Sequence, residues 1–408
     1  MIALTALIFF LVYLGLVAGR LPGVGLDRSG MALLGAIALL ATGAVDETRA
    51  MAAIDVPTIA LLFGLMVLSA QLRLGGFYSW VVTAVAACRA GPTLLLLLLI
   101  LAIGMLAAVF SNDIICLAAT PVLIALCRRR RLPPVPFLLG LAMAANIGSG
   151  ATLIGNPQNI LIGEVRNLSF RAYLLEAGPL ALFGLLAAWA VLAWQYRHRW
   201  QPAADDPTDP PQIQPFSPWK TGKGLCAALA LLLLFLGTDL PRDLCALAVA
   251  GILLVSRRLT SRAILSLVDW QLLLLFVSLF ILNDAIGRTG LPALAVDWLA
   301  AAGIDLGRPA PLITGITLLS NAVSNVPAVI LLLPLTESPH SGTILALAST
   351  FAGNLFLVGS IANIIVSEEA ARAGITLDWR THCKSGIPIT LLTLLLVWLR
   401  YGLVPAPP

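Results

Sequence analysis

Ten apolar segments, each about as long as a membrane-crossing helix, dominate the chain. A bilayer core about 30 Å thick takes roughly 20 helical residues, and somewhat fewer where the flanks adapt. The expected spans are 2–19, 30–45, 56–72, 138–165, 173–195, 222–238, 241–256, 264–285, 342–366 and 385–403. Only 11% of the residues are charged, against roughly 25% in an ordinary soluble domain. The sequence therefore predicts an all-α polytopic membrane protein embedded in a lipid bilayer.

Two further apolar stretches, residues 91–127 and 309–336, are interrupted near the middle by a Ser-Asn pair. The pairs are Ser111-Asn112 and Ser324-Asn325. Polar backbone at that depth is tolerated only where it is buried in protein or lines a cavity. We therefore expect two re-entrant hairpins whose tips stop partway across the membrane. The alternative is two ordinary spans with a short polar connection, for which the second stretch is too short.

The chain also contains an internal repeat. At a constant offset of 204, Leu141, Ala142, Ala144, Gly155, Asn159, Ile160 and Glu164 match Leu345, Ala346, Ala348, Gly359, Asn363, Ile364 and Glu368. Both Ser-Asn pairs are followed by a proline, Pro121 and Pro334, at the same spacing. We expect one repeat at 1–195 and a second at 222–408, joined by a Pro- and Asp-rich linker at 196–221. Each repeat would hold five spans and one hairpin, giving about 10 spans and 2 hairpins.

Five crossings per repeat is an odd number, so the second copy must enter the membrane upside down, as in many secondary transporters. The positive-inside rule fixes the orientation. With the linker 196–221 in the cytoplasm, most of the 25 Lys and Arg residues fall on the inner side. We expect a protein of the cytoplasmic membrane with both termini outside.

One expected helix in each repeat contains residues that should break it. In the span 138–165 the segment Asn146 to Asn159 reads NIGSGATLIGNPQN, and Gly costs about 1 and Pro about 3 kcal/mol in a helix interior. The milder equivalent in 342–366 contains Gly353-Asn354 and Gly359-Ser360 and has no proline. A broken helix offers free carbonyls and amides that can bind a cation and an anion. The alternative is that the glycines only allow close helix packing.

The Ser-Asn tips, the NIGSGATLIGNPQN break and the inverted repeat resemble the ion transporter superfamily. It includes divalent-anion/sodium symporters, citrate transporters, arsenite-efflux permeases and sodium/proton antiporters, and the GNPQN string is most similar to uncharacterised anion permeases within it. The resemblance implies that hairpins and broken helices form a mobile transport domain, with the other helices forming a scaffold that is often a homodimer interface. It also implies a substrate and ion site at the tips and breaks. The candidate residues are Ser111, Asn112, Asp113, Asn146, Gly148, Ser149, Thr152, Asn156, Pro157, Ser324, Asn325, Gly353, Asn354, Gly359 and Ser360.

The third position of each tip departs from the sodium/dicarboxylate relatives, which carry Thr there. This chain has Asp113 and Val326. A carboxylate within the membrane is costly and functional by default, and it repels an anion unless it is protonated or paired with a cation. We expect Asp113 to carry a proton, or to bind Na⁺ together with Ser111, Asn112 and Gly148. The alternative is a structural cap on the second hairpin arm.

Together these features predict a secondary active transporter working by alternating access. Its substrate would be a small inorganic or organic anion or a neutral oxyacid, coupled to H⁺ or Na⁺. An arsenite-efflux permease and a sodium/proton antiporter remain alternatives. No metal-ligand spacing, catalytic cluster or ATP-binding P-loop stands out in the sequence, so we expect no enzyme activity, resident cofactor or metal centre. A net charge of +5 is too small for a nucleic-acid partner.

Overall fold

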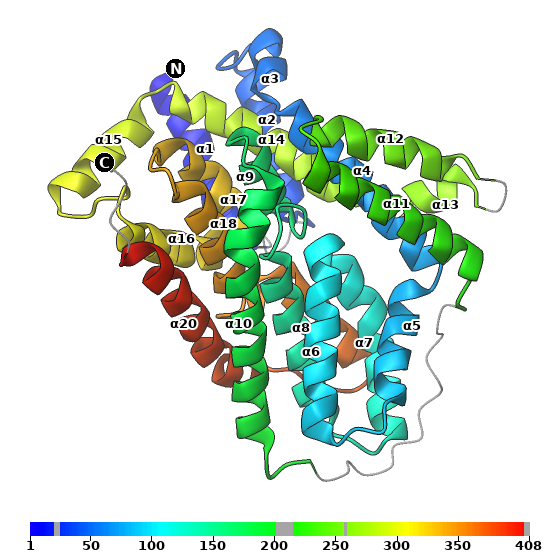
Figure 1. Cartoon of the computed structure of the whole chain (residues 1–408). Helices are drawn as coiled ribbons and strands as arrows, with labels where there is room; N and C mark the ends of the chain where they lie inside the picture. The colour runs from blue at the N-terminus through cyan, green and yellow to red at the C-terminus, as the bar shows by residue number, and fades with distance from the viewer. Residues whose placement is uncertain (20–24, 201–214, 257–258, 404–408) are drawn as a thin grey trace.

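The computed structural model describes residues 1–19, 25–200, 215–256 and 259–403, and the regular structure of these residues is entirely helical (Figure 1). Before the linker lie α1 (Ile2–Ala18), α2 (Arg28–Ala41), α3 (Glu47–Ala53), α4 (Val56–Leu74), α5 (Phe77–Ala87), α6 (Pro92–Val109), α7 (Asn112–Arg129), α8 (Pro134–Ser149), α9 (Pro157–Val165) and α10 (Phe170–Tyr196). The all-α prediction is confirmed.

After the linker the helices follow the same order. They are α11 (Pro218–Gly237), α12 (Arg242–Leu254), α13 (Ser261–Leu265), α14 (Trp270–Gly287), α15 (Leu291–Ala301), α16 (Pro309–Val323), α17 (Asn325–Leu332), η1 (Leu333–Leu335), α18 (Ser341–Ala352), η2 (Leu357–Gly359), α19 (Ile361–Arg372) and α20 (Trp379–Gly402). Each series begins with two helices, a short helix and a long helix. An 11-residue helix, a pair joined at a Ser-Asn tip, an interrupted helix and a long final helix follow.

Equivalent helices also begin in the same way. Asp55 caps α4 and Asp269 caps α14, each accepting a hydrogen bond of 2.9 Å from the backbone N–H three residues on. Such caps satisfy backbone donors that have no partner within the helix. Gly76 and Gly290 precede α5 and α15 with φ of 72° and 74°, a left-handed conformation that glycine adopts without strain. The local structures therefore recur at an offset of 214.

The two series are interlocked through exchanged helix pairs. Helix α2 packs on α14, and α12 packs on α4. The buried positions of α2 and α12 correspond at an offset of 214: Met31, Ala32, Gly35, Ala36 and Leu39 in α2, and Cys245, Ala246, Val249, Ala250 and Leu253 in α12. A Cβ on Gly64 would lie 2.7 Å from the backbone of Ala246, so α4 and α12 approach closely because Gly64 has no side chain.

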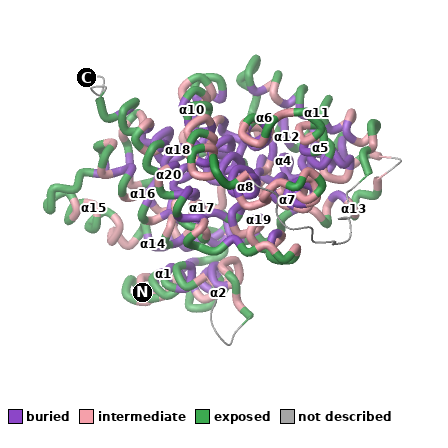
Figure 2. The backbone as a smooth tube through the Cα atoms, turned by 90° about the horizontal axis from the view of Figure 1, so that it is seen from below, coloured by how far each residue is buried: buried purple, intermediate pink, exposed green. Residues whose placement is uncertain are grey.

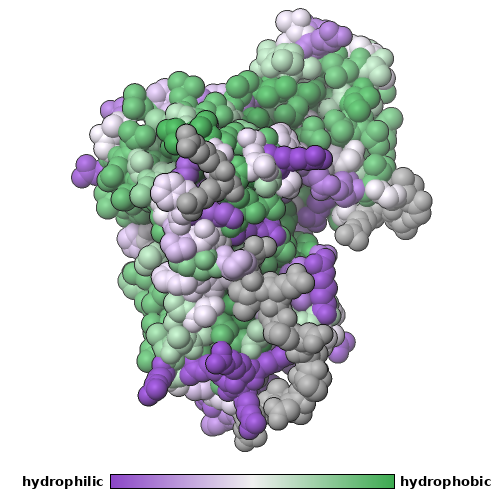
Figure 3. Space-filling model, turned by 90° about the vertical axis from the view of Figure 1, so that its right-hand side faces the viewer, coloured by the Kyte–Doolittle hydropathy of each residue, from purple (hydrophilic) through white to green (hydrophobic). Residues whose placement is uncertain are grey.

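The outer surface is suited to lipid. Six of the described helices, α4, α6, α10, α11, α14 and α20, are long and apolar enough to cross a membrane, and several others are shorter apolar helices. Large apolar side chains such as Phe10, Met105 and Trp298 are well exposed. Figure 3 shows apolar residues over much of one face, with hydrophilic residues gathered at its lower end. An exposed apolar area of this extent indicates membrane contact.

The core lies around the interrupted helices. Every residue of α18 and nearly every residue of α8 is buried, whereas α15 has no buried residue (Figure 2). A helix that is apolar all round and buried all round belongs inside a bundle.

The structure differs from the expected segments in detail. The short helices α3, α5, α13 and α15 were not predicted, because helices of 5 to 11 residues carry too little apolar periodicity to stand out. The span expected at 264–285 begins instead at Trp270, since Asp269 caps α14. The stretch 91–127 is folded as α6 and α7 with the change of direction at Phe110 and Ser111.

Candidate functional site

Both Ser-Asn tips and both interrupted helices border one small cavity of about 40 Å³. Its walls are Asn112, Asp113, Asn146, Ser149, Asn156, Pro157, Gln158, Leu272, Ser324, Asn325, Val326, Thr350, Ser360 and Ile361. The fold thus brings together segments that are far apart in the sequence. Most of these residues are polar but uncharged, which is unusual for the interior of an apolar bundle.

The first tip places a carboxylate at a helix N-terminus. Ser111 is the N-cap of α7, and Asp113 lies in its first turn. The Asn112 side chain accepts a hydrogen bond of 3.0 Å from the backbone N–H of Asp113. A negative charge is favourable at this end of the helix dipole. No ion pair joins Asp113 to another of the described residues.

The second tip is strained. Ser324, between α16 and α17, has φ of 81°, a region in which residues other than glycine are held only by surrounding structure, at roughly 1–3 kcal/mol. Such strain concentrates at ligand-binding and switching positions. The Oδ1 atom of Asn325 is buried and has no hydrogen-bond partner among the residues that the structure describes.

Further unpaired polar atoms lie near the second tip. Three buried oxygens on the last turns of α16 have no hydrogen-bond partner in the described part of the chain: Thr317 Oγ1, Ser320 Oγ and Asn321 Oδ1. A buried polar atom left unpaired costs about 1–3 kcal/mol. These oxygens therefore favour a ligand that can satisfy them, such as a cation or water.

The first helix break is held open by Asn156 and Asn159. Asn156 caps α9 by accepting a hydrogen bond of 2.9 Å from the backbone N–H of Asn159. The amide of Asn159 donates to the carbonyls of Ser149 at 3.4 Å and Thr152 at 3.0 Å. These bonds replace helical hydrogen bonds lost between α8 and α9, as buried backbone groups require.

The second break repeats this arrangement. Ser360 caps α19 by accepting a bond of 3.2 Å from the N–H of Ala362. The amide of Asn363 donates to the carbonyls of Gly353 at 2.8 Å and Phe356 at 3.3 Å. Ser360, Asn363, Gly353 and Phe356 lie 204 positions after Asn156, Asn159, Ser149 and Thr152, so the bonds of the two side-chain amides correspond. The caps differ, because the N–H that donates is three residues on in the first break and two residues on in the second.

Hydrogen bonds also join the second break to a helix of the first series. The Nδ2 atom of Asn146 in α8 donates to Oδ1 of Asn354 at 2.8 Å and of Asn363 at 3.0 Å. Ser360 in turn donates to Asn146 Oδ1 at 2.7 Å. Asn146 thereby fixes the second break from the first series.

A reciprocal set of bonds is centred on Thr350 of α18. Its hydroxyl accepts from Asn156 Nδ2 at 3.0 Å and from Gln158 Nε2 at 3.3 Å, and donates to Asn159 Oδ1 at 3.4 Å. Thr350 stands 204 residues after Asn146. Each break is therefore held by the buried helix of the other series.

Six candidate residues do not line the cavity: Ser111, Gly148, Thr152, Gly353, Asn354 and Gly359. A Cβ on Gly148 would lie 2.2 Å from the Gly104 carbonyl oxygen, so Gly148 allows α8 to approach α6, the packing role considered from the sequence. A Cβ on Gly359 would lie 2.6 Å from Asn321 Oδ1. The Thr152 hydroxyl donates to the Ala108 carbonyl. Whether any candidate binds substrate or ion stays a prediction.

Five lining residues were not among the candidate site residues: Gln158, Leu272, Val326, Thr350 and Ile361. Val326 was noted only because it stands where the sodium/dicarboxylate relatives carry Thr. Thr350 could have been found, because the offset of 204 maps it onto Asn146. Gln158 lay within the NIGSGATLIGNPQN segment but was not singled out. Leu272 and Ile361 are apolar residues without a motif.

Residues 9–352 match the citrate transporter family. The chain belongs to that family. Inner membrane protein YbiR of Escherichia coli K12 is 33% identical, covering 87% of this chain and 90% of that protein. The silicon efflux transporter LSI3 of Oryza sativa subsp. japonica is 28% identical and 91% of each chain is covered.

The fold is similar to a solved transporter structure. The YdaH transporter of Alcanivorax borkumensis matches with a TM-score of 0.58 over 99% of both chains, at 16% sequence identity. The resemblance to the ion transporter superfamily is thus confirmed, and the protein is a helical membrane transporter.

Proposed function

We propose that the protein transports a small, uncharged oxyacid by alternating access, coupled to protons through Asp113. The observation that carries this proposal is the composition of the cavity lining. Among the described residues that line the cavity, only Asp113 has a charged side chain. Moving an anion from water into a site without a cation is costly. A neutral acid with several hydroxyl groups instead exchanges hydrogen bonds to water for bonds to amides and hydroxyls.

Asp113 supplies the coupling in this proposal. In the ionised state it accepts hydrogen bonds from hydroxyl groups of the substrate, and in the protonated state it can also donate one. Because substrate binding differs between the two states, the proton equilibrium and the binding equilibrium are linked. Asp113 lines the cavity and forms no ion pair with any other described residue.

One named relative supports this substrate class. LSI3 is a silicon efflux transporter, and silicic acid in water is an uncharged acid with four hydroxyl groups. Arsenous acid, the substrate of the arsenite-efflux alternative, is also uncharged near neutrality and falls within the same class.

A second candidate is Na⁺ as the coupling ion, as in a symporter or a sodium/proton antiporter. It is favoured by the unpaired oxygens of Thr317, Ser320, Asn321 and Asn325. In this form of the proposal Na⁺ binds at the second tip. At the first tip, by contrast, Asn112 Oδ1 already accepts the Asp113 N–H.

The membrane arrangement is proposed on the charge distribution of the sequence. The protein lies in the cytoplasmic membrane, with the linker 196–221 in the cytoplasm and both termini outside. A homodimer through the outer helices is the proposed assembly.

The test is an uptake panel in proteoliposomes containing silicic acid, arsenite, phosphate, sulfate, citrate and succinate, with imposed H⁺ or Na⁺ gradients. Silicic acid or arsenite should enter faster with a pH gradient, and citrate and sulfate should not. Transport of citrate or sulfate, with no flux of a neutral acid, would contradict the proposed substrate class. Stimulation by Na⁺ alone would favour the second candidate for the coupling ion.

A further inference from the structure

Two Arg–Glu pairs occupy corresponding places in the two series of helices. Glu164 of α9 and Glu368 of α19 are 204 residues apart, the offset of the helix breaks. Arg28 and Arg242 are the first residues of α2 and α12. They are 214 residues apart, the offset at which the buried positions of these two helices match. The expected pairs are therefore Arg242 with Glu164, and Arg28 with Glu368.

The first pair is closed. Arg242 Nε lies 2.9 Å from Glu164 Oε1, and the side chains are only 14% and 12% exposed. The guanidinium also donates to the carbonyls of Gly163 at 2.7 Å and Leu168 at 3.0 Å. Arg242 thus ties the start of α12 to the end of α9 and the turn that follows it.

The second pair is open. Arg28 and Glu368 both line a cavity of about 530 Å³, whose other lining residues come from the end of α1, the start of α2, η2 and α19. Within the described part of the chain neither residue forms an ion pair, and Arg28 Nε is buried without a partner. Arg372, one turn beyond Glu368, is paired with Glu369 instead.

The open cavity adjoins the central one along α19. Ile361 lines the central cavity and Ile364 lines the open cavity. Residues three apart lie on the same face of a helix, so the two spaces are separated by about one turn of α19. The start of α19 is also the part of the second break that is capped by Ser360.

We propose that the two Arg–Glu pairs are alternating latches, which rests on the proposed alternating-access function. In the state described here the Arg242–Glu164 latch is closed and the space between Arg28 and Glu368 is open. In the opposite state the Arg28–Glu368 latch closes and the Arg242–Glu164 latch opens. Each latch joins the broken helix of one series to the first residue of a helix that packs on α4 or α14.

The exchange explains how a mostly buried ion pair can open. Removing the partner of a buried charge leaves an uncompensated charge and is strongly destabilising. If an equivalent pair forms as the first one breaks, the number of closed pairs stays the same. The two states can then have similar free energies, as a transporter that passes repeatedly between them requires.

Cross-linking in the full-length protein tests the proposal. Arg28→Cys and Glu368→Cys are combined, the reconstituted protein is oxidised, and the peptide linked through positions 28 and 368 is measured by mass spectrometry. The cross-link should form in a minority of molecules. Adding Glu164→Gln should raise its yield at least about fivefold, the low end for coupling between linked states. Failure of the cross-link to form, or a yield unchanged by Glu164→Gln, would overturn the proposal.

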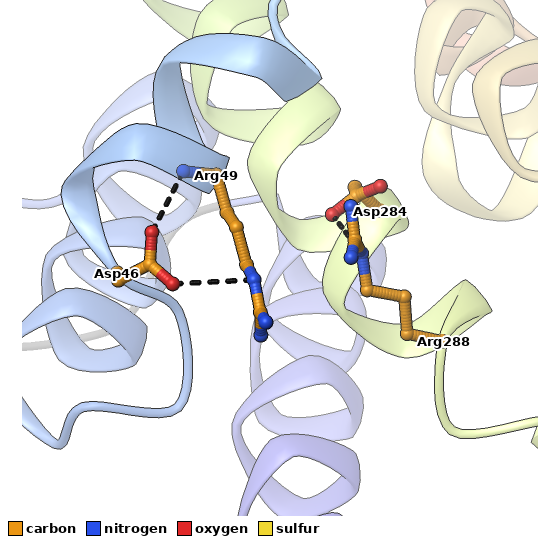
Figure 4. Close-up of polar contacts among 4 residues, drawn as sticks. All are labelled: Asp46, Arg49, Asp284 and Arg288. Atoms are coloured by element: carbon orange, nitrogen blue, oxygen red, sulfur yellow. Dashed lines mark hydrogen bonds and ion pairs between the residues drawn. The ribbon is translucent and has the colours of Figure 1, made fainter.

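The control is a carboxylate–arginine pair that lies within one helix and joins no two helices. Asp284 and Arg288 pair at 2.8 Å on α14, beside the Asp46–Arg49 pair (Figure 4), and are 29% and 55% exposed. Asp284→Asn should leave the yield of the 28–368 cross-link unchanged. An equal rise with Asp284→Asn would show a general loosening of the fold and would count against the latches.

A second measurement avoids the paired cysteines. Val358 lines the open cavity and is 56% exposed, so Val358→Cys should react rapidly with a water-soluble maleimide. Arg242→Gln should slow this reaction, because it favours closure of the cavity, and an unchanged rate would contradict the proposal. Neither measurement uses a transported substrate. If both succeed while no oxyacid is carried, the proposed substrate class is wrong and the latches stand.

Discussion

Replacing Asn146 by Ala should destabilise the protein by about 2–3 kcal/mol. Asn146 makes three hydrogen bonds, to Asn354, Asn363 and Ser360, all buried. At about 1 kcal/mol for each lost bond the total is about 3 kcal/mol, and at the average of about 0.6 kcal/mol measured between membrane helices it is about 2 kcal/mol. The lost free energy comes from the contact between α8 and the second helix break.

The assay is reversible unfolding in mixed micelles with increasing sodium dodecyl sulfate, followed by circular dichroism. Thr314→Ala is the control, because the Thr314 hydroxyl is exposed and bonds within its own helix, and its effect should stay within about 0.5 kcal/mol. Asn146→Thr places at 146 the residue found at the equivalent position 350, and should recover part of the loss.

A double-mutant cycle with Ser360→Ala decides whether the loss arises from the cross-series bonds. Residues joined by a hydrogen bond show coupling of roughly 0.5–3 kcal/mol, whereas independent sites are additive. Full additivity of Asn146→Ala and Ser360→Ala, or a loss below about 0.5 kcal/mol for Asn146→Ala alone, would refute the reasoning.

Three further outcomes are expected. Asp113→Asn should abolish the acceleration of transport by a pH gradient in proteoliposomes; a variant that still concentrates substrate with the pH profile of the wild type would show that Asp113 is only a cap. Gly148→Ala should lower the free energy of unfolding by about 1–3 kcal/mol or more, because the added Cβ would overpack against Gly104. Gly150→Ala should lower it less in the same assay, because its Cβ would meet its nearest neighbours at 3.3 Å. Cysteines introduced at 205–215 should be labelled by impermeant reagents only from the cytoplasm and those at 239–243 only from outside; labelling of both from one face would contradict the inverted repeat.

The sequence was most informative where polar residues interrupt apolar runs. Asn112, Asp113, Asn156 and Asn325 attract notice because each is costly at membrane depth, and all four line the cavity. The offset of 204 between Asn159 and Asn363 predicts two amides in equivalent places, and both donate to corresponding carbonyls. The role of such residues can be inferred from their polarity alone, because few other reasons would place them in an apolar helix.

Other features depend on contacts between distant segments and could not be predicted. The role of Gly148 follows from Gly104 lying against it, and no local pattern relates the two. Thr350 is a single hydroxyl residue in an apolar helix, which is common. Its role in holding the first helix break is visible only from its hydrogen bonds to Asn156 and Asn159. The helices α5 and α15 have 11 residues each, too few for a membrane span and too apolar to be recognised as loops.

The crossed hydrogen bonds of Asn146 and Thr350 have a consequence for the direction of transport. Because each break is fastened to the buried helix of the opposite series, the walls of the cavity should move as one body and keep their shape. A pocket that keeps its shape has nearly the same affinity for its cargo whether it faces one compartment or the other. Such a carrier has no built-in preference for import or export, and the concentrations of cargo and coupling ion on the two sides decide which way the net flow runs.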